Sequence, residues 1–138
     1  MKIDRIIIHH SLTKDSETVS WGAIRDFHVQ INKFKEIGYH FGVENLRGQT
    51  EILVGRMSDE TGAHCQGHNT GSIGICLVGN FDEAPPPAES WDLAVKLCRY
   101  LVRQFGVKEI LGHTELNPGK SCPGKMFNMT RFRRDVFM

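Results

Sequence analysis

The chain has 138 residues, a length that fits one domain. Its apolar fraction of 40%, charged fraction of 24% and net charge of +1 are those of a soluble globular protein. Both signs of charge are scattered along the chain, which argues against a nucleic-acid-binding or membrane-surface protein. A basic cluster near the end, Arg131, Arg133 and Arg134, is interpreted as a solvated helix face.

The N-terminal residues lack the apolar core of a signal peptide, because Lys2, Asp4 and Arg5 interrupt them. No apolar run approaches the roughly 18 residues that a membrane helix needs. We therefore expect a protein made in the cytoplasm, without an export signal and without membrane insertion. In that reducing compartment the four cysteines are expected to be free thiols or metal ligands.

The first half of the chain predicts strands around one helix. The apolar run at 3–9 is typical of a buried strand, and helical spacing of apolar residues around 19–34 predicts a helix before Gly38. Both Trp21 in this helix and Trp91 further on are expected in the core. Two strands, 39–46 and 50–54, are predicted around a turn, followed by a polar loop over 58–72 and a buried strand over 73–79.

The second half predicts two more helices and one strand. Prolines 85–87 precede a helix whose apolar face carries Leu93, Leu97 and Leu101 and is widened by Phe105, and Gly106 is expected to end it. A strand over 108–112, a loop over 113–125 and a short last helix follow. Alternating strands and helices predict one α/β domain over 1–138, with a mixed sheet flanked by helices.

Three residues of metal-ligand type stand at predicted strand ends or in a turn. His9 ends the first strand, His113 follows the strand at 108–112, and Cys122 lies in a turn rich in proline and glycine. Two imidazoles and one thiolate would suit zinc, with a fourth position open for water. Taken singly, such a histidine is more often structural, and a lone cysteine is usually a small buried residue.

Four stretches, in order and across almost the whole chain, resemble the type-two N-acetylmuramoyl-L-alanine amidases, which include phage lysozyme-like endolysins and the peptidoglycan recognition proteins. They are 6–11 (IIIHHS), 38–41 (GYHF), 62–81 (GAHCQGHNTGSIGICLVGNF) and 112–124 with GH at its start and KSCPG at its end. The compact length most resembles the phage enzymes, although the loop from His113 to Cys122 is one residue longer here.

The resemblance implies a zinc ion on His9, His113 and Cys122, and a catalytic pair formed by Tyr39 and Lys120. His10 is expected to point to the opposite face of its strand and to be structural. Substrate contacts are expected from the polar loop before the central strand, at four positions: His64, His68, Asn69 and Ser72. Asn69 and Ser72 could equally shape the turn. No glutamate matches a general base, and the nearest in sequence are Glu51 and Glu115.

The implied function is hydrolysis of the amide bond between N-acetylmuramic acid and L-alanine in peptidoglycan, by a monomer acting as a phage or prophage endolysin on the cell wall after release. Alternatives are a cytoplasmic amidase that recycles muropeptides and a non-catalytic peptidoglycan-binding module. A third is a structural zinc site closed by His10 or Cys65. The substrate is then peptidoglycan or a muropeptide, and no nucleic acid is expected as a partner.

Overall fold

The structure is a computed structural model that describes residues 2–12 and 20–138. Its elements in chain order are β1 (Arg5–His10), α1 (Trp21–Asp26), η1 (Phe27–Ile31), β2 (Phe41–Leu46), β3 (Gln49–Val54), β4 (Ser72–Leu77), α2 (Ala88–Phe105), β5 (Glu109–Gly112), α3 (His113–Leu116) and α4 (Met129–Phe137). Of these, η1 is a wider π-helical turn that continues α1. No helix in the described ranges is long and apolar enough to cross a bilayer.

In the described part of the chain, five strands form one mixed sheet in the order β3-β2-β4-β1-β5. β1 pairs in parallel with β4 and β5, β2 pairs in parallel with β4, and β3 runs antiparallel to β2 as a hairpin. The central strands β1 and β4 are buried almost throughout, which explains why both read as apolar runs. The expected α/β class, with helices on a mixed sheet, is confirmed.

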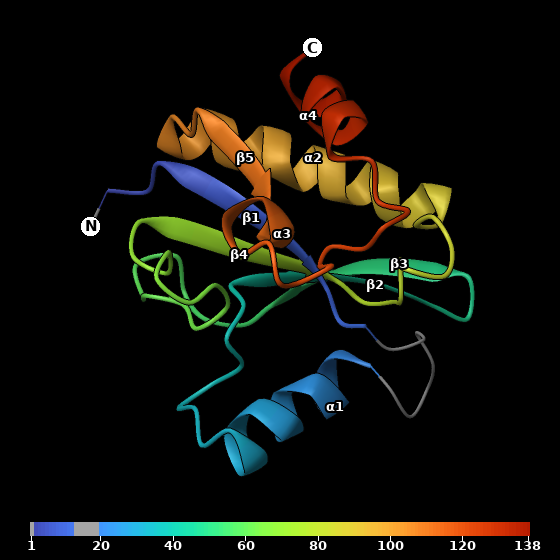
Figure 1. Cartoon of the computed structure of the whole chain (residues 1–138). Coiled ribbons are helices and arrows are strands. Elements are labelled where there is room, and N and C mark those ends of the chain that lie inside the picture. Colours follow the sequence, from blue (N-terminus) through green and yellow to red (C-terminus); the bar gives the residue numbers. More distant parts are fainter. Residues whose placement is uncertain (1, 13–19) are drawn as a thin grey trace.

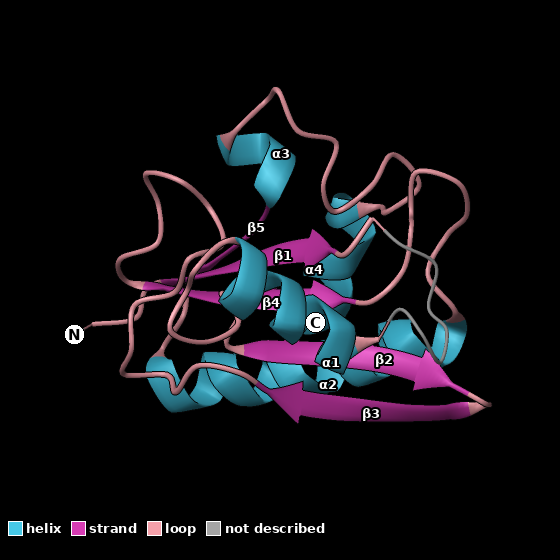
Figure 2. Cartoon of the chain, turned by 90° about the horizontal axis from the view of Figure 1, so that it is seen from below, coloured by secondary structure: helices cyan, strands magenta, loops and turns pink. Residues whose placement is uncertain are grey.

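Helices cover both faces of the sheet (Figure 1). α2 and α4 pack on one face over the larger core, whose aromatic centre is Trp91 against Phe127 and Phe132. α1 crosses the other face (Figure 2), where Trp21 packs against the sheet. A Cβ at Gly42 would stand 2.3 Å from the Trp21 ring, so this glycine of β2 makes room for it. Both tryptophans are buried, as expected.

Several predicted boundaries and core positions are wrong. The helix predicted over 19–34 runs from Trp21 to Ile31, with residue 19 outside the described ranges. Phe27 and Ile31, in its second half, are exposed. Phe105, at the last turn of α2, is also exposed, whereas Gly106 ends that helix with a left-handed φ of 66° as expected.

Two strand ends also differ from the prediction. β2 begins at Phe41 instead of residue 39, although the two preceding residues still bond the neighbouring segments: the His40 amide donates to the Gly74 carbonyl, and the Tyr39 carbonyl accepts from the Arg56 amide. β4 ends at Leu77, two residues before Gly79, whose φ of 151° turns the chain. The predicted loop over 113–125 begins with the single turn of α3.

Candidate metal centre

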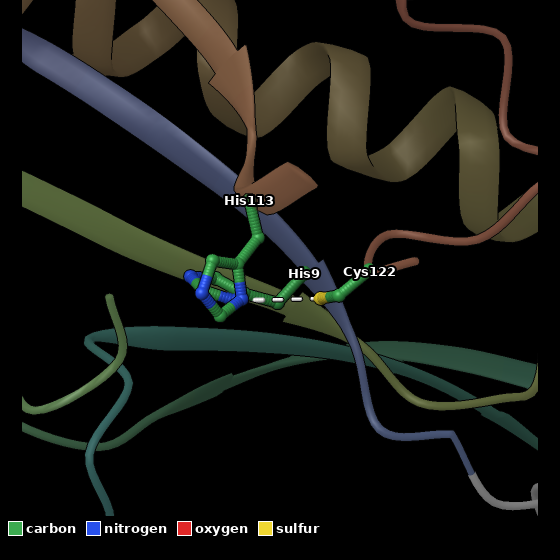
Figure 3. Close-up of side chains that lie close together, drawn as sticks. All are labelled: His9, His113 and Cys122. Carbon is green, nitrogen blue, oxygen red and sulfur yellow. Dashed lines mark hydrogen bonds between the residues drawn. The ribbon is translucent and has the colours of Figure 1, made fainter. Parts of the chain in front are cut away.

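Three side chains converge where β1 and β5 end (Figure 3): those of His9, His113 and Cys122. One ligand atom from each lies within 4.8 Å of the others. The Cys122 Sγ is 3.5 Å from the His9 Nδ1, and the two imidazole rings have centroids 4.7 Å apart. This trio, expected from the sequence, is therefore a cluster in the fold.

Parallel pairing of β1 with β5 brings the two histidines together. Ile8 lies opposite Gly112, so the next residues, His9 and His113, are neighbours at the same edge of the sheet. His113 opens α3, and the Glu115 carboxylate of that turn accepts a hydrogen bond from the Gly112 amide at 2.8 Å. Arg133 of α4 bonds the same carboxylate at 2.7 Å, which ties the His113 turn to the rest of the domain.

Cys122 is positioned by backbone contacts with the elements that carry the histidines. Its Sγ accepts a hydrogen bond from the His10 amide at 3.3 Å, and its carbonyl accepts one from Thr114 at 2.7 Å. The Asp82 carboxylate holds the loop from both sides, accepting from the Ser121 hydroxyl and the Lys125 amide, each at 2.8 Å. The thiol is therefore placed before any metal is bound.

We expect Asp82→Ala to loosen the 121–125 loop and to weaken metal binding without unfolding the sheet. Hydrogen bonds from Lys125 and Ser121 lower the pKa of Asp82 in the folded protein. The ionised carboxylate therefore stabilises the fold at pH values above the pKa of an unfolded aspartate, and this stabilisation is lost as the pH falls through the lower pKa of the folded state. Wild type should thus melt higher than the variant at neutral pH, and the two should converge in acid. Thermal unfolding of the metal-free proteins across pH measures this, with Asp59→Ala as an exposed-aspartate control; a constant difference at all pH values would contradict it.

The ligands are uncharged in the metal-free chain. Burial is the main reason that the pKa of His9 is lowered well below its ordinary value, and the neighbouring rings of His64 and His113 lower it further. Burial likewise raises the pKa of the Cys122 thiol to about 12. A cation would reverse the thiol's preference, because a coordinated thiol loses its proton.

The donor set fits zinc. Two imidazoles and a thiol are ligands that this ion prefers, and soft sulfur disfavours magnesium and calcium. The 3.5 Å between His9 Nδ1 and Cys122 Sγ is close to the roughly 3.6 Å that tetrahedral geometry implies for a nitrogen and a sulfur ligand.

Neither residue considered as a fourth ligand points into the cluster. His10 lies on the opposite face of β1, where its Nδ1 accepts a hydrogen bond from the Phe81 amide at 3.0 Å, as expected for a structural histidine. Cys65 is buried, and its Sγ accepts from the Asn117 side chain at 3.5 Å. Among the described residues the cluster thus contains three protein ligands, the number found in zinc sites that keep a position for water or substrate.

Tyr39 faces the cluster from the segment just before β2. Its ring centroid is 5.1 Å from that of His9. Burial is the main cause that raises the pKa of its phenol well above the ordinary value, and the thiols of Cys76 and Cys122 beside it add to the effect. The phenol therefore keeps its proton at neutral pH and can act as a hydrogen-bond donor.

Two adjoining hollows flank the cluster and meet at Gln66. One, of about 310 Å³, is lined by Tyr39 and His64 among others. The second, of about 550 Å³, is lined by His113 and by the exposed Lys120. Tyr39 therefore lines one of these adjoining hollows and Lys120 lines the other.

Two of the four residues expected to contact substrate line a hollow beside the cluster. His64 and Asn69 line the hollow beside Tyr39, although the Asn69 side chain is engaged in its own loop, accepting from the amides of His64 and Cys65. Ser72 is buried beneath the loop and bonds the His68 carbonyl, so it shapes the turn. The assignment of these four residues to substrate binding stays a prediction.

Neither glutamate considered as a general base belongs to the cluster. Glu51 is at the exposed hairpin, opposite Glu44. Burial acts to raise the pKa of Glu115, but hydrogen bonds from Arg133 and Gly112 outweigh it and the pKa is lowered. Glu115 is therefore an ion-paired support of the His113 turn.

Sequence reasoning missed two residues that support the cluster. Asp82 holds the loop of Cys122, and the Asn117 side-chain amide lies 3.2 Å from His113 Nε2. Asp82 follows the matching stretch 62–81 directly, and Asn117 lies within the part of the His113–Cys122 loop that departs from the family pattern. No motif or spacing in the sequence marked either of them.

The fold and the cluster define an α/β domain with three side chains of metal-ligand type gathered at one edge of its sheet. Comparison with known proteins agrees with this class. The family model for N-acetylmuramoyl-L-alanine amidase matches residues 1–125, and the chain therefore belongs to that family. The family, the fold and the enzyme class expected from the sequence are confirmed.

Relatives of the chain include both enzymes and recognition proteins. It is 33% identical to the endolysin of Escherichia phage T7 over 135 residues, covering 94% of this chain and 84% of that protein. It is 34% identical to peptidoglycan-recognition protein SD of Drosophila melanogaster over 105 residues, covering 74% of this chain but about half, 54%, of that protein.

Among solved structures, the amidase LysC from Clostridium intestinale URNW superimposes with a TM-score of 0.86. The two are 25% identical, and the match covers 99% of this chain and 86% of the other.

Proposed function

We propose that this chain is a zinc-dependent N-acetylmuramoyl-L-alanine amidase that cuts the bond between N-acetylmuramic acid and the L-alanine of the stem peptide. The observation that carries the proposal is the cluster of His9, His113 and Cys122, with one ligand atom from each within 4.8 Å of the others. The presence of Cys122 and of the Tyr39 phenol beside the cluster favours an enzyme over a module that only binds peptidoglycan.

The chain's own residues would bind the ion and stabilise the charge that develops on the substrate. Zinc, when bound, supplies a Lewis acid and a nucleophile that is effective at neutral pH. Tyr39, whose phenol stays protonated, is proposed to donate a hydrogen bond to the carbonyl oxygen as it gains negative charge. Lys120, exposed at the rim of the second hollow, is proposed to approach the same oxygen with its ammonium group.

Lysis of the cell wall is the role that we favour over recycling of wall fragments. Similarity to phage endolysins covers more than nine tenths of the chain, and the protein would act on the wall after release from the cell. We propose that residues 1–138 work as one domain and as a monomer, without a nucleic-acid partner. Faster hydrolysis of intact sacculi than of isolated muropeptides would support lysis, and the reverse preference would favour recycling.

Product analysis tests the choice of bond. Digestion of purified peptidoglycan by the zinc-loaded chain should release peptides with a free L-alanine amino group. It should create no new reducing sugar ends, because cleavage of a glycosidic bond needs a pair of carboxylates, whereas the proposed site consists of two histidines and a cysteine. Amino-group labelling, reducing-end assay and mass spectrometry of the products measure this. New reducing ends without free L-alanine would overturn the assignment.

A further inference from the structure

The ring nitrogen of His9 that does not face the cluster is engaged by another histidine. His9 Nδ1 lies 3.5 Å from Cys122, and His9 Nε2 lies 2.9 Å from His64 Nδ1. The two rings are nearly perpendicular, at 89°, and both side chains are buried. His64 comes from a loop 55 residues further along the chain, so only the folded domain creates this contact.

The hydrogen bonds beyond His64 have a direction, because they end on carbonyl oxygens that can only accept. The hydroxyl of Ser72 donates to the carbonyls of His68 and Asn69, at 2.8 and 3.0 Å. Its single hydrogen is used there, so toward His64 Nε2, 3.2 Å away, it accepts. On this basis we assign the proton of His64 to Nε2, which leaves its Nδ1 as the acceptor for a proton on His9 Nε2.

Glycines build a slot for the His64 ring. A Cβ at Gly74 of β4 would stand 2.5 Å from the ring, and one at Gly62 would stand at the same distance from His64 Cδ2. The ring therefore packs directly on the backbone of the central strand and cannot turn freely. Ser72 belongs to the same strand and His9 to the neighbouring β1, so the residues on either side of His64 are both in the sheet.

From this geometry we infer that His64 is a positioning residue: with Ser72 it fixes His9 as the Nε2–H tautomer, so that the bare Nδ1 faces the metal. The inference rests on the proposed metal site and deepens it. A ligand nitrogen that is already free of its proton and correctly oriented binds the ion without first exchanging tautomer or rotating. It also gives His64 and Ser72 a role beneath the metal centre that differs from contact with the substrate.

Zinc affinity is the first test, measured on the metal-free proteins by competition with a chromophoric chelator. His64→Phe keeps a ring but removes the acceptor, and should weaken zinc binding about 10–100-fold, the usual effect of losing an outer partner of a ligand. His64→Asn places an oxygen near the position of Nδ1 and should recover most of that loss, and Ser72→Ala should weaken binding less than His64→Phe. Ser90→Ala removes the hydroxyl of another buried serine, in α2 on the other face of the sheet, and should bind zinc as wild type does.

Imidazole NMR of the metal-free wild type tests the tautomer without any metal. Long-range ¹H–¹⁵N correlations should show His9 protonated on Nε2, and in His64→Phe the signal should move toward a mixture of tautomers. Thermal unfolding of the metal-free variants separates a loss of folding from a loss of positioning. His9 protonated on Nδ1 in the wild type, or unchanged zinc affinity in a folded His64→Phe, would overturn the inference. Failure of the wild type to bind zinc would instead refute the proposed function, while the tautomer result would still stand.

Discussion

Removal of zinc is expected to abolish hydrolysis of peptidoglycan by the wild-type chain. Purified protein should contain about one zinc ion per chain, because the described residues bring together one set of three ligands. Exhaustive chelation should stop clearing of a wall suspension, and stoichiometric zinc should restore it. Metal content by mass spectrometry and turbidity loss measure the two quantities. Full activity after verified metal removal would contradict the proposed function.

Replacing one ligand should have the same effect without a chelator. Cys122→Ser exchanges a thiol for a hydroxyl that keeps its proton. Zinc affinity should therefore fall by more than the roughly 10–100-fold that is lost when a residue hydrogen-bonded to a ligand is removed, and activity should fall with it. Cys98→Ala is the matched control, because Cys98 is buried in α2 in the core on the far face of the sheet. It should retain one zinc per folded chain. Equal loss of zinc in both variants would indicate a general effect of removing a thiol.

Tyr39→Phe and Lys120→Ala are expected to lower turnover by about a hundredfold or more each, the usual value of one donor to a developing oxyanion. Both donors are proposed to act on charge that appears only in the transition state, so KM for wall fragments should change little while kcat falls. Zinc content should stay at the wild-type level, since neither residue belongs to the ligand cluster. Stability should barely move, because a phenol hydroxyl and an exposed ammonium contribute little packing.

Two further substitutions make this result interpretable. Tyr100→Phe removes a phenol hydroxyl from an exposed position on α2, and Lys125→Ala removes an exposed lysine from the same loop as Lys120. Both should hydrolyse peptidoglycan at the wild-type rate. Near-normal turnover in zinc-loaded Lys120→Ala would show that the family role of this lysine does not extend to the present chain. Near-normal turnover in Tyr39→Phe would show that the Tyr39 side chain contributes packing and that its hydroxyl does not act in catalysis.

Local patterns in the sequence were sufficient for the elements and the ligand types. β1 and β4 are buried on both faces, so their apolar runs identified them, and the left-handed residue that α2 requires at its end is a glycine in the expected place, Gly106. His9 and His113 were recognisable at strand ends and Cys122 in a turn rich in proline and glycine, and all three occur within stretches that resemble a family. The error at Phe105 arose because exposure at the last turn of a helix depends on which distant segments pack against it.

Only the tertiary structure decided how these residues act on one another. Pairing of β1 with β5 brings His9 beside His113, and the Asp82 carboxylate, from the segment after β4, holds the loop of Cys122. The contact between His9 and His64 joins residues 55 positions apart, and its direction is set by the carbonyls of a turn. Such hydrogen bonds have no period or spacing in the sequence, because they depend on strand order and on the space left by glycines of the sheet, both of which arise only when distant segments pack together.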